Sequence, residues 1–181
     1  YVDDDLTDFL FGVRSQECAG RFVQCRECLL AFLALDGGDG VANRLTEFVE
    51  YFDLPIGFFT RVSDDRQEIV TAVGDHPLIQ PGETCPLEDA YCRRTIDMDE
   101  VLAVQDVHAS PIPNRAVETF DLGTYIGTKI VVDDEVYGTV CFAAEDRREA
   151  PFSEAQTLFL ELLGNLISTV LERQQYEQRI E

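Results

Sequence analysis

The stretch YIGTKIVVDDEVYGTVCFAA, residues 125–144, decides the fold of this chain. Two runs rich in β-branched and aromatic residues stand on either side of Asp133-Asp134, and such runs favour β-strands. A two-residue connection is the commonest hairpin turn, and Asp tolerates the left-handed backbone that this turn needs. The sequence therefore predicts a long antiparallel hairpin over residues 124–144.

Shorter patterns before this hairpin predict further helices and strands. Apolar residues at helical spacing end at Pro55, and β-rich runs separated by turn residues predict strands. The predicted elements are helices over 41–54, 87–96 and 115–120, strands over 56–62, 68–73 and 101–107, and a Pro- and Gly-rich loop over 74–86. Strands and helices do not alternate regularly, so the expected fold class is α+β, an antiparallel sheet with helices packed on it.

Both ends of the chain predict helices. Ser153 and Gln156 have capping-box spacing, and the apolar residues after them predict a long helix over 153–181. Its polar end predicts that the chain continues into another module, and a first residue other than Met predicts a fragment of a longer protein. Residues 1–35 carry one apolar helical stripe, and DGGDG at 36–40 predicts a flexible break.

The charge of the chain is its strongest compositional signal. Asp and Glu number 35 against 14 Lys and Arg, which gives a net charge of −21, and Lys129 is the single lysine. This balance disfavours nucleic-acid binding, because phosphate contacts need clustered Lys and Arg. Acidic surfaces poor in lysine are typical of salt-accumulating archaea, in which salt screens the self-repulsion. We expect halophile adaptation, with an acidic surface for a basic partner as the alternative.

Six cysteines raise the question of redox or metal chemistry. On one helix, Cys85 and Cys92 would lie about 10.5 Å apart along the axis, whereas a disulfide needs Cα atoms within about 7 Å. Pro86 favours a loop at Cys85, so packing, ligand contact and redox chemistry all stay open. The CxxC pair Cys25 and Cys28 lacks a second pair at zinc-finger spacing, so no metal site is predicted.

Five phrases occur in an order that is typical of one family. They are DLPIGFFTRV, IVTAVGDHPLIQPGETCPLEDAYCRRTI, VQDV, FDLGTYIGTKIVVDDEVYGTVCF and PFSEAQTLFLELLGNLIS. Together they cover roughly residues 41–173 and resemble a GAF domain of haloarchaeal sensor kinases and transcriptional regulators. The resemblance implies a six-stranded antiparallel sheet with helices on one face. It also implies a small-molecule pocket on the other face, capped by residues 74–100 and 106–123.

The resemblance also implies a domain organisation and a candidate site. An N-terminal helical extension covers residues 1–35, the GAF sensor domain covers 41–173, and a C-terminal signalling helix over 153–181 overlaps the domain end. The candidate ligand-binding residues are Phe59, Cys85, Tyr91, Cys92, Asp106, Tyr125 and Phe142. For each of them, plain core packing is the competing interpretation.

The activities and cofactors known in GAF domains supply alternative functions for this chain. Free methionine-(R)-sulfoxide reductases are single GAF domains, and VQDVHASP resembles one of their regions, but residues 103–140 contain no cysteine to act as the nucleophile. Covalent bilin attachment commonly uses a cysteine followed by histidine, which this chain lacks. The NK…F…DE signature of cyclic-nucleotide binding is matched only loosely at 114–121, and haem held by a lone histidine stays open. The sequence therefore leaves the cofactor unknown.

These observations predict a non-enzymatic, cytoplasmic sensor module of a multidomain signalling protein, which binds an unidentified small molecule. Pocket occupancy would shift the terminal helices of a parallel homodimer and regulate a covalently linked histidine kinase or DNA-binding domain. No apolar run approaches the roughly 20 residues that span a membrane. The alternative is a GAF domain that serves only for dimerisation.

Overall fold

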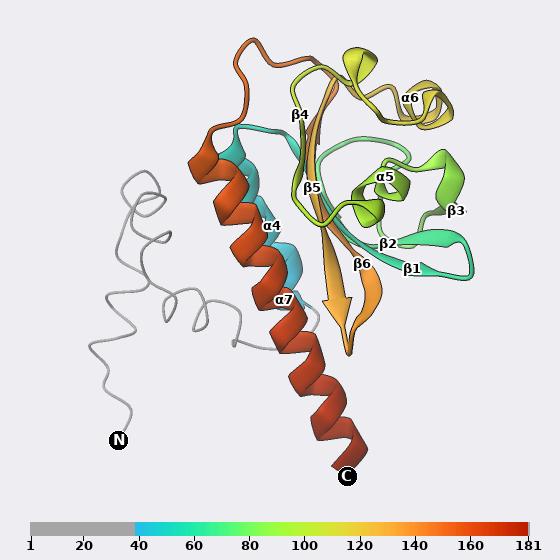
Figure 1. The fold of residues 1–181 in the computed structure, drawn as a ribbon, viewed down its shortest axis with the longest axis vertical. Helices are drawn as coiled ribbons and strands as arrows, with labels where there is room; N and C mark the ends of the chain where they lie inside the picture. The colour runs from blue at the N-terminus through green and yellow to red at the C-terminus, as the bar shows by residue number, and fades with distance from the viewer. Residues whose placement is uncertain (1–38, 181) are drawn as a thin grey trace.

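The structure, a computed structural model, describes residues 39–180. Its centre is a six-stranded antiparallel sheet with the strand order β3-β2-β1-β6-β5-β4 (Figure 1). The strands are β1 (Ile56–Ser63), β2 (Arg66–Val73), β3 (Thr84–Pro86), β4 (Leu102–Val104), β5 (Thr124–Val132) and β6 (Glu135–Ala144). The expected α+β class with a six-stranded antiparallel sheet is therefore confirmed.

Two hairpins with the same turn chemistry build most of the sheet. β5 and β6 pair along their whole length, which confirms the hairpin expected over 124–144. Asp133 and Asp134 between them have φ angles of 50° and 65°, and Asp64 and Asp65 between β1 and β2 have φ angles of 51° and 59°. Positive φ at both central residues is the mark of a type I′ turn, whose twist matches that of the flanking strands.

One extra residue in β2 decides which face its side chains occupy. The pairing of β1 steps from Ile69 directly to Thr71, so Val70 has no partner on β1. This is a β-bulge, and it shifts the in-out alternation by one residue. Ile69 therefore packs in the core cluster on one face of the sheet, whereas Thr71 pairs with Phe59, which packs in the cluster on the other face.

The two long helices cover one face of the sheet together (Figure 1). α4 (Asp39–Phe52) ends in the aromatic core, where the rings of Phe52 and Phe142 stack with centroids 4.7 Å apart. The helix begins at Asp39, so the last two residues of the loop expected at 36–40 are already helical. The helix expected over residues 1–35 lies outside the described part of the chain.

Local signals set the start and the position of α7 (Glu154–Ile180). The Ser153 N–H donates to Gln156 Oε1 at 2.9 Å, and the Gln156 N–H donates to Ser153 Oγ at 3.2 Å, so the expected capping box is present. Gly164 allows close contact with β5, because a Cβ there would lie 2.7 Å from Thr128 Cγ2. No helix within residues 39–180 has the length and apolar content that a membrane crossing requires.

Short helices cover the opposite face (Figure 1). They are η1 (Leu87–Asp89), α5 (Cys92–Asp97), η2 (Val107–Ala109) and α6 (Asn114–Phe120). The helix expected over 87–96 is split, because Ala90 adopts an extended conformation between η1 and α5. The strand expected over 101–107 is shortened to β4, since the Asp106 side chain accepts a hydrogen bond from the His108 N–H and starts η2.

Candidate functional site

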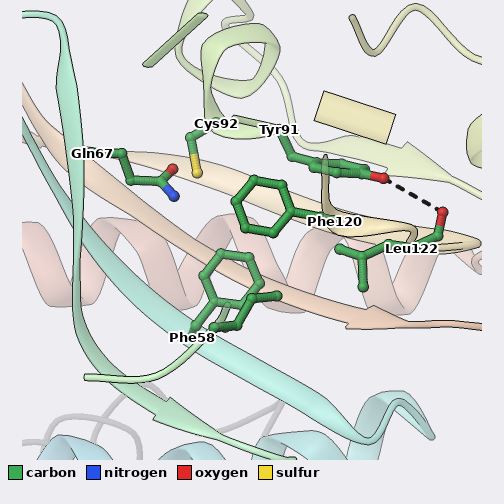
Figure 2. A pocket seen from close by; sticks show the side chains of 7 residues that line it. Phe58, Gln67, Tyr91, Cys92, Phe120 and Leu122 are labelled. Carbon is green, nitrogen blue, oxygen red and sulfur yellow. Dashed lines mark hydrogen bonds between the residues drawn. The ribbon is translucent and has the colours of Figure 1, made fainter. Parts of the chain in front are cut away.

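A small cavity lies between the sheet and the segment that carries α5 and α6. Its lining side chains are Phe58, Gln67, Ile79, Tyr91, Cys92, Phe120 and Leu122. Figure 2 shows the Gln67 carboxamide and the Cys92 sulfur beside the rings of Phe58 and Phe120. The cavity volume of about 10 Å³ has room for roughly one water molecule.

The lining residues come from five parts of the chain, one of which is the loop after β2 that carries Ile79. Phe58 and Gln67 face the cavity from β1 and β2, while Tyr91 and Cys92 stand at the start of α5. Phe120 is the last residue of α6, and Asp121 follows it with a left-handed φ of 50°. This sharp end of α6 lets Phe120 and Leu122 line the same cavity on either side of the turn.

A few hydrogen bonds hold the cover of the cavity in place. His76 Nε2 donates to the Phe120 carbonyl oxygen at 2.8 Å, and His76 Nδ1 accepts from the Leu78 N–H at 3.2 Å. The Tyr91 hydroxyl donates to the Leu122 carbonyl oxygen at a longer distance of 3.4 Å (Figure 2). His76 therefore connects the loop after β2 to the end of α6, and the two segments form one cover.

Gln67 carries a polar atom without a partner in this apolar setting. The side chain is only 3% exposed, and its Nε2 lies 3.7 Å from Cys85 Sγ. Its Oε1 is buried and has no hydrogen-bond partner. Buried polar atoms in folded proteins are nearly always paired, so an orphan oxygen in a cavity wall calls for an explanation.

Cys92 belongs to a buried network of thiols and hydroxyls. Its Sγ lies 2.9 Å from Thr139 Oγ1, and Cys141 Sγ lies 3.2 Å from the same oxygen. Thr60 Oγ1 is 2.7 Å from Thr139 Oγ1. The Tyr125 hydroxyl lies 3.0 Å from Cys141 Sγ, so the network reaches β5 as well. Within residues 39–180, no three His, Cys, Asp or Glu side chains lie together in a way that could hold a metal ion.

Burial and hydrogen bonding shift the pKa values of the groups in and around the cavity. Burial raises the pKa of Cys85 to about 11 and that of Tyr91 to about 12. Burial also raises the pKa of Cys141 and of Tyr125 well above the ordinary values. For Cys92, burial opposes the thiolate, but hydrogen bonds from Cys141, Thr139 and Thr60 favour it and lower the pKa. Of the two neighbouring thiols Cys92 and Cys141, Cys92 would therefore ionise first.

Two of the seven candidate residues, Tyr91 and Cys92, line the cavity. Cys85 does not line it, but its Sγ lies 3.7 Å from Nε2 of the lining residue Gln67. Tyr125 lies one layer deeper, where its hydroxyl is 2.6 Å from Thr95 Oγ1. Core packing and ligand contact are thus not exclusive for these residues, because buried side chains form the cavity wall.

The other three candidate residues lie elsewhere, which corrects the grouping expected from the sequence. Phe59 and Phe142 belong to the core cluster under α4 and α7, on the face of the sheet away from the cavity. Side chains alternate along a strand, so Phe58 rather than Phe59 faces the cavity. Asp106 lies in a shallow depression with Arg147, on the outer surface.

Five lining residues were missed by the sequence reasoning. They are Phe58, Gln67, Ile79, Phe120 and Leu122. Side chains alternate between the two faces along β1, so Phe58 could have been identified if the face of one other residue on this strand had been known. The bulge at Val70 hides Gln67, because counting by twos along β2 fails across an extra residue.

These features define a class of α+β domain whose sheet carries long helices on one face and a capped pocket on the other. The family model described as GAF domain matches residues 39–172, and the chain belongs to the GAF domain family. Domains of this family are commonly sensor or regulatory modules. The comparison with curated proteins found no match.

Several solved structures share the fold at low sequence identity. The GAF domain of the Acinetobacter phosphoenolpyruvate-protein phosphotransferase matches with a TM-score of 0.69 and 12% identity, over 92% of this chain and 99% of that one. Free methionine-R-sulfoxide reductase of Neisseria meningitidis matches with a TM-score of 0.68 and 17% identity, over 90% and 96%. The phycocyanobilin-bound GAF domain of a cyanobacterial phytochrome matches with a TM-score of 0.67 and 13% identity, over 91% and 98%.

Proposed function

We propose that this GAF domain is a non-enzymatic sensor module, in which a small molecule bound in the cavity biases the position of α7. The observation that carries the proposal is the placement of a capped pocket and a long helix on opposite faces of one sheet. α5, whose first residue Cys92 lines the pocket, and α7 both contact the same strand, β5. An occupant that moves the cover can therefore act on α7 through a single rigid element.

The contacts across β5 give this coupling a physical route. On the pocket side, the Tyr125 hydroxyl lies 2.6 Å from Thr95 Oγ1 on α5. On the helix side, the Val131 N–H of the same strand donates to Ser168 Oγ on α7 at 3.2 Å, and Thr128 contacts Gly164. A displacement of α5 on ligand entry would thus strain a strand that also positions α7.

Exposed apolar residues on α7 support a homodimer as the output state. Leu158, Leu162, Tyr176 and Ile180 are 49%, 40%, 65% and 68% exposed. Their spacing of 4, 14 and 4 residues places them on one side of the helix. In the proposal, two copies pack these stripes in parallel and pass the change to a covalently linked output module, a histidine kinase or a DNA-binding domain.

The acidic composition supports the proposed setting. A net charge of −21 with one lysine suits the cytoplasm of a salt-accumulating archaeon, where multimolar salt screens repulsion between carboxylates. In this setting the domain would serve a two-component system or a transcription regulator. The charge also argues against direct contact between this domain and nucleic acid.

Native mass spectrometry with an absorption spectrum, on protein purified in multimolar KCl, tests the sensor proposal. A co-purified molecule of defined mass would support it, and addition of that molecule should alter hydrogen exchange in α7. If the molecule binds the cavity but leaves α7 unchanged, the coupling part of the proposal is wrong.

A purely dimerising GAF domain is the second candidate function, and the size of the cavity favours it. A volume of about 10 Å³ is far below that of ordinary ligand sites, which hold a few hundred Å³. This candidate predicts a clean apo mass and a dimer whose stability does not respond to any added small molecule. Native mass spectrometry and the response to an added small molecule therefore distinguish the two candidate functions.

A reductase function is the enzymatic alternative, since one of the similar structures is a free methionine-R-sulfoxide reductase. The cysteines of the described region are Cys85, Cys92 and Cys141, and residues 103–140 contain none. Incubation with free methionine sulfoxide and a dithiol reductant should give no methionine above the uncatalysed rate. Turnover that is lost in Cys92→Ser would instead establish the enzyme.

A further inference from the structure

We propose that the cavity selects an uncharged, planar aromatic ligand that donates one hydrogen bond to the Gln67 carboxamide oxygen. This inference rests on the proposed sensor function and names the chemical class that the same site would recognise. Three independent features of the cavity carry it: the absence of charge in its wall, the orphan oxygen, and the aromatic rings around it.

The wall of the cavity offers nothing to a charged ligand. Of its seven lining side chains, four are apolar, and the other three carry a carboxamide, a thiol and a phenol. The pKa of the Tyr91 phenol is raised to about 12, so this group is neutral at physiological pH. A carboxylate or phosphate taken into this wall would lose its hydration without gaining a cation.

Charges just outside the wall do not reverse this selection. Burial is the main cause that raises the pKa of Cys85 and of Tyr91, and Asp89 and Asp121 add to it in the same direction. Arg66 acts on Cys85 in the opposite direction, and Arg115 pairs with Asp89 at 2.9 Å. The uncharged wall itself therefore sets the preference for an uncharged ligand.

Gln67 determines that the ligand group it recognises is a hydrogen-bond donor. Its Nε2 is directed to Cys85 Sγ, which leaves Oε1 as the acceptor in the cavity wall. Figure 2 shows the carboxamide at the side of the cavity opposite Tyr91, with the ring of Phe120 between them. An N–H or O–H of the ligand would satisfy an oxygen that is now buried and unpaired, so binding removes a penalty already present in the fold.

Aromatic rings set the shape of the ligand. The Tyr91 and Phe120 rings pack edge to face with centroids 6.0 Å apart, and Phe58 forms the opposite wall (Figure 2). Rings prefer offset or edge contacts with other rings, so a flat ligand can replace the contacts of one wall ring. Since the cavity holds only about one water molecule, entry requires the cover at Phe120 and Leu122 to move outward.

Indole is the probe that tests this inference, because the protein has no tryptophan and indole fluorescence then reports binding directly. Two matched probes accompany it on the 181-residue chain in multimolar KCl. Benzofuran has the same ring size without the N–H, and its affinity is measured by displacement of indole. Indole-3-carboxylate keeps the N–H and adds a negative charge.

We expect indole to bind at least about tenfold more tightly than benzofuran or indole-3-carboxylate. Gln67→Met, which keeps the length of the side chain, should reduce the ratio between indole and benzofuran to about one. Gln178→Met, at an exposed position on α7, is the matched control and should leave the ratio unchanged. The comparison of probes on the unmodified protein does not depend on the folding of any variant.

Other outcomes overturn the inference. Tighter binding of the carboxylate, equal binding of indole and benzofuran, or an unchanged ratio in folded Gln67→Met would each do so. Failure of all three probes would also overturn it, while a different co-purified molecule found by native mass spectrometry would leave the sensor proposal intact. A clean apo mass together with failure of all probes would instead favour the purely dimerising domain.

Discussion

At the scale of single residues, the three cysteines of the described region differ in exposure and should differ in reactivity. Cys92 and Cys141 are buried, whereas Cys85 is partly exposed with its pKa raised to about 11. At about pH 9 an ordinary thiol with a pKa near 9 is half ionised, and Cys85 would be about 1% ionised. We expect Cys85 to alkylate about fiftyfold more slowly than a free thiol, and the other two more slowly still.

Site-resolved mass spectrometry after timed exposure to iodoacetamide measures these rates one cysteine at a time. The control is the same reaction in urea, where the three rates should become similar. Equal labelling of the three cysteines in the folded protein would contradict the burial that the structure gives them.

The raised pKa values also predict how stability depends on pH. Cys85 goes from its usual 9.0 to about 11 and Tyr91 from 10.0 to about 12 in the folded protein. The unfolded chain therefore releases these protons first as the pH rises, and the folded state binds more protons in that range. Stability from these groups is complete below about pH 9 and should fall as the pH rises through about 9 to 12.

Urea unfolding at several pH values checks this sign. Tyr91→Phe keeps the ring but removes one ionisable group, so its stability should fall less steeply above about pH 9 than that of the unmodified protein. The variant should lose no more than about 1 kcal/mol at neutral pH, because the bond to Leu122 is long. A pH dependence identical to that of the unmodified protein would argue against a titrating Tyr91.

Residue identities alone predicted only part of the candidate site. Tyr91 and Cys92 could be selected because they belong to a motif on a short helix. Phe59 was selected in place of Phe58 because the alternation of side chains puts the two residues on opposite faces of the sheet without showing which face borders the pocket. That choice depends on pairing with β6, a contact distant in sequence.

At the scale of elements, the contact between α7 and β5 depends on the missing side chain at Gly164. We expect Gly164→Ala to destabilise the fold by about 1 kcal/mol, since the new methyl group meets Thr128 Cγ2 and outweighs the gain in helix propensity. The double variant Gly164→Ala with Thr128→Ser removes that methyl group and should recover most of the loss.

Thermal or urea unfolding of this set measures the effect. Asn165→Ala, at the exposed neighbouring position, is the control for a change in helix propensity without a clash. If the double variant is as unstable as Gly164→Ala, the close contact with Thr128 is not the cause.

Element predictions succeeded where the signal is local. The Asp-Asp turns, the capping box and the apolar spacing of α7 each lie within a few residues, so the chain specifies them without help from distant parts. β3 was missed because three residues carry no periodicity, and it exists only through pairing with β2. The strand over 101–107 was overextended because a single side chain, Asp106, ends it.

At the scale of the whole molecule, the net charge of −21 should make stability depend on salt. The Debye length shortens from about 10 Å at 0.1 M to about 3 Å at 1 M, so repulsion between surface carboxylates weakens. We expect the urea midpoint to be higher in multimolar KCl than at low salt. Greater stability at low salt would contradict halophile adaptation.

The apolar stripe of α7 predicts the oligomeric state. We expect a dimer by light scattering in multimolar KCl, and a monomer after Leu158→Glu combined with Leu162→Glu. Val136→Glu, at an exposed apolar residue on the β5–β6 hairpin, is the matched control and should leave the dimer intact. A monomer in the unmodified protein would count against association through α7.

The bulge at Val70 is a place where the length of the chain can change without changing the pocket. Thr71 pairs with Phe59 and Ile69 pairs with Thr60, so removal of Val70 would close the bulge and keep both pairings. Gln67 would then stay in the cavity wall. A deletion between Gln67 and Ile69 would instead shift the register by one residue and turn the preceding side chains to the other face. In relatives of this domain, the position of a deletion in β2 therefore decides whether the pocket keeps its chemistry.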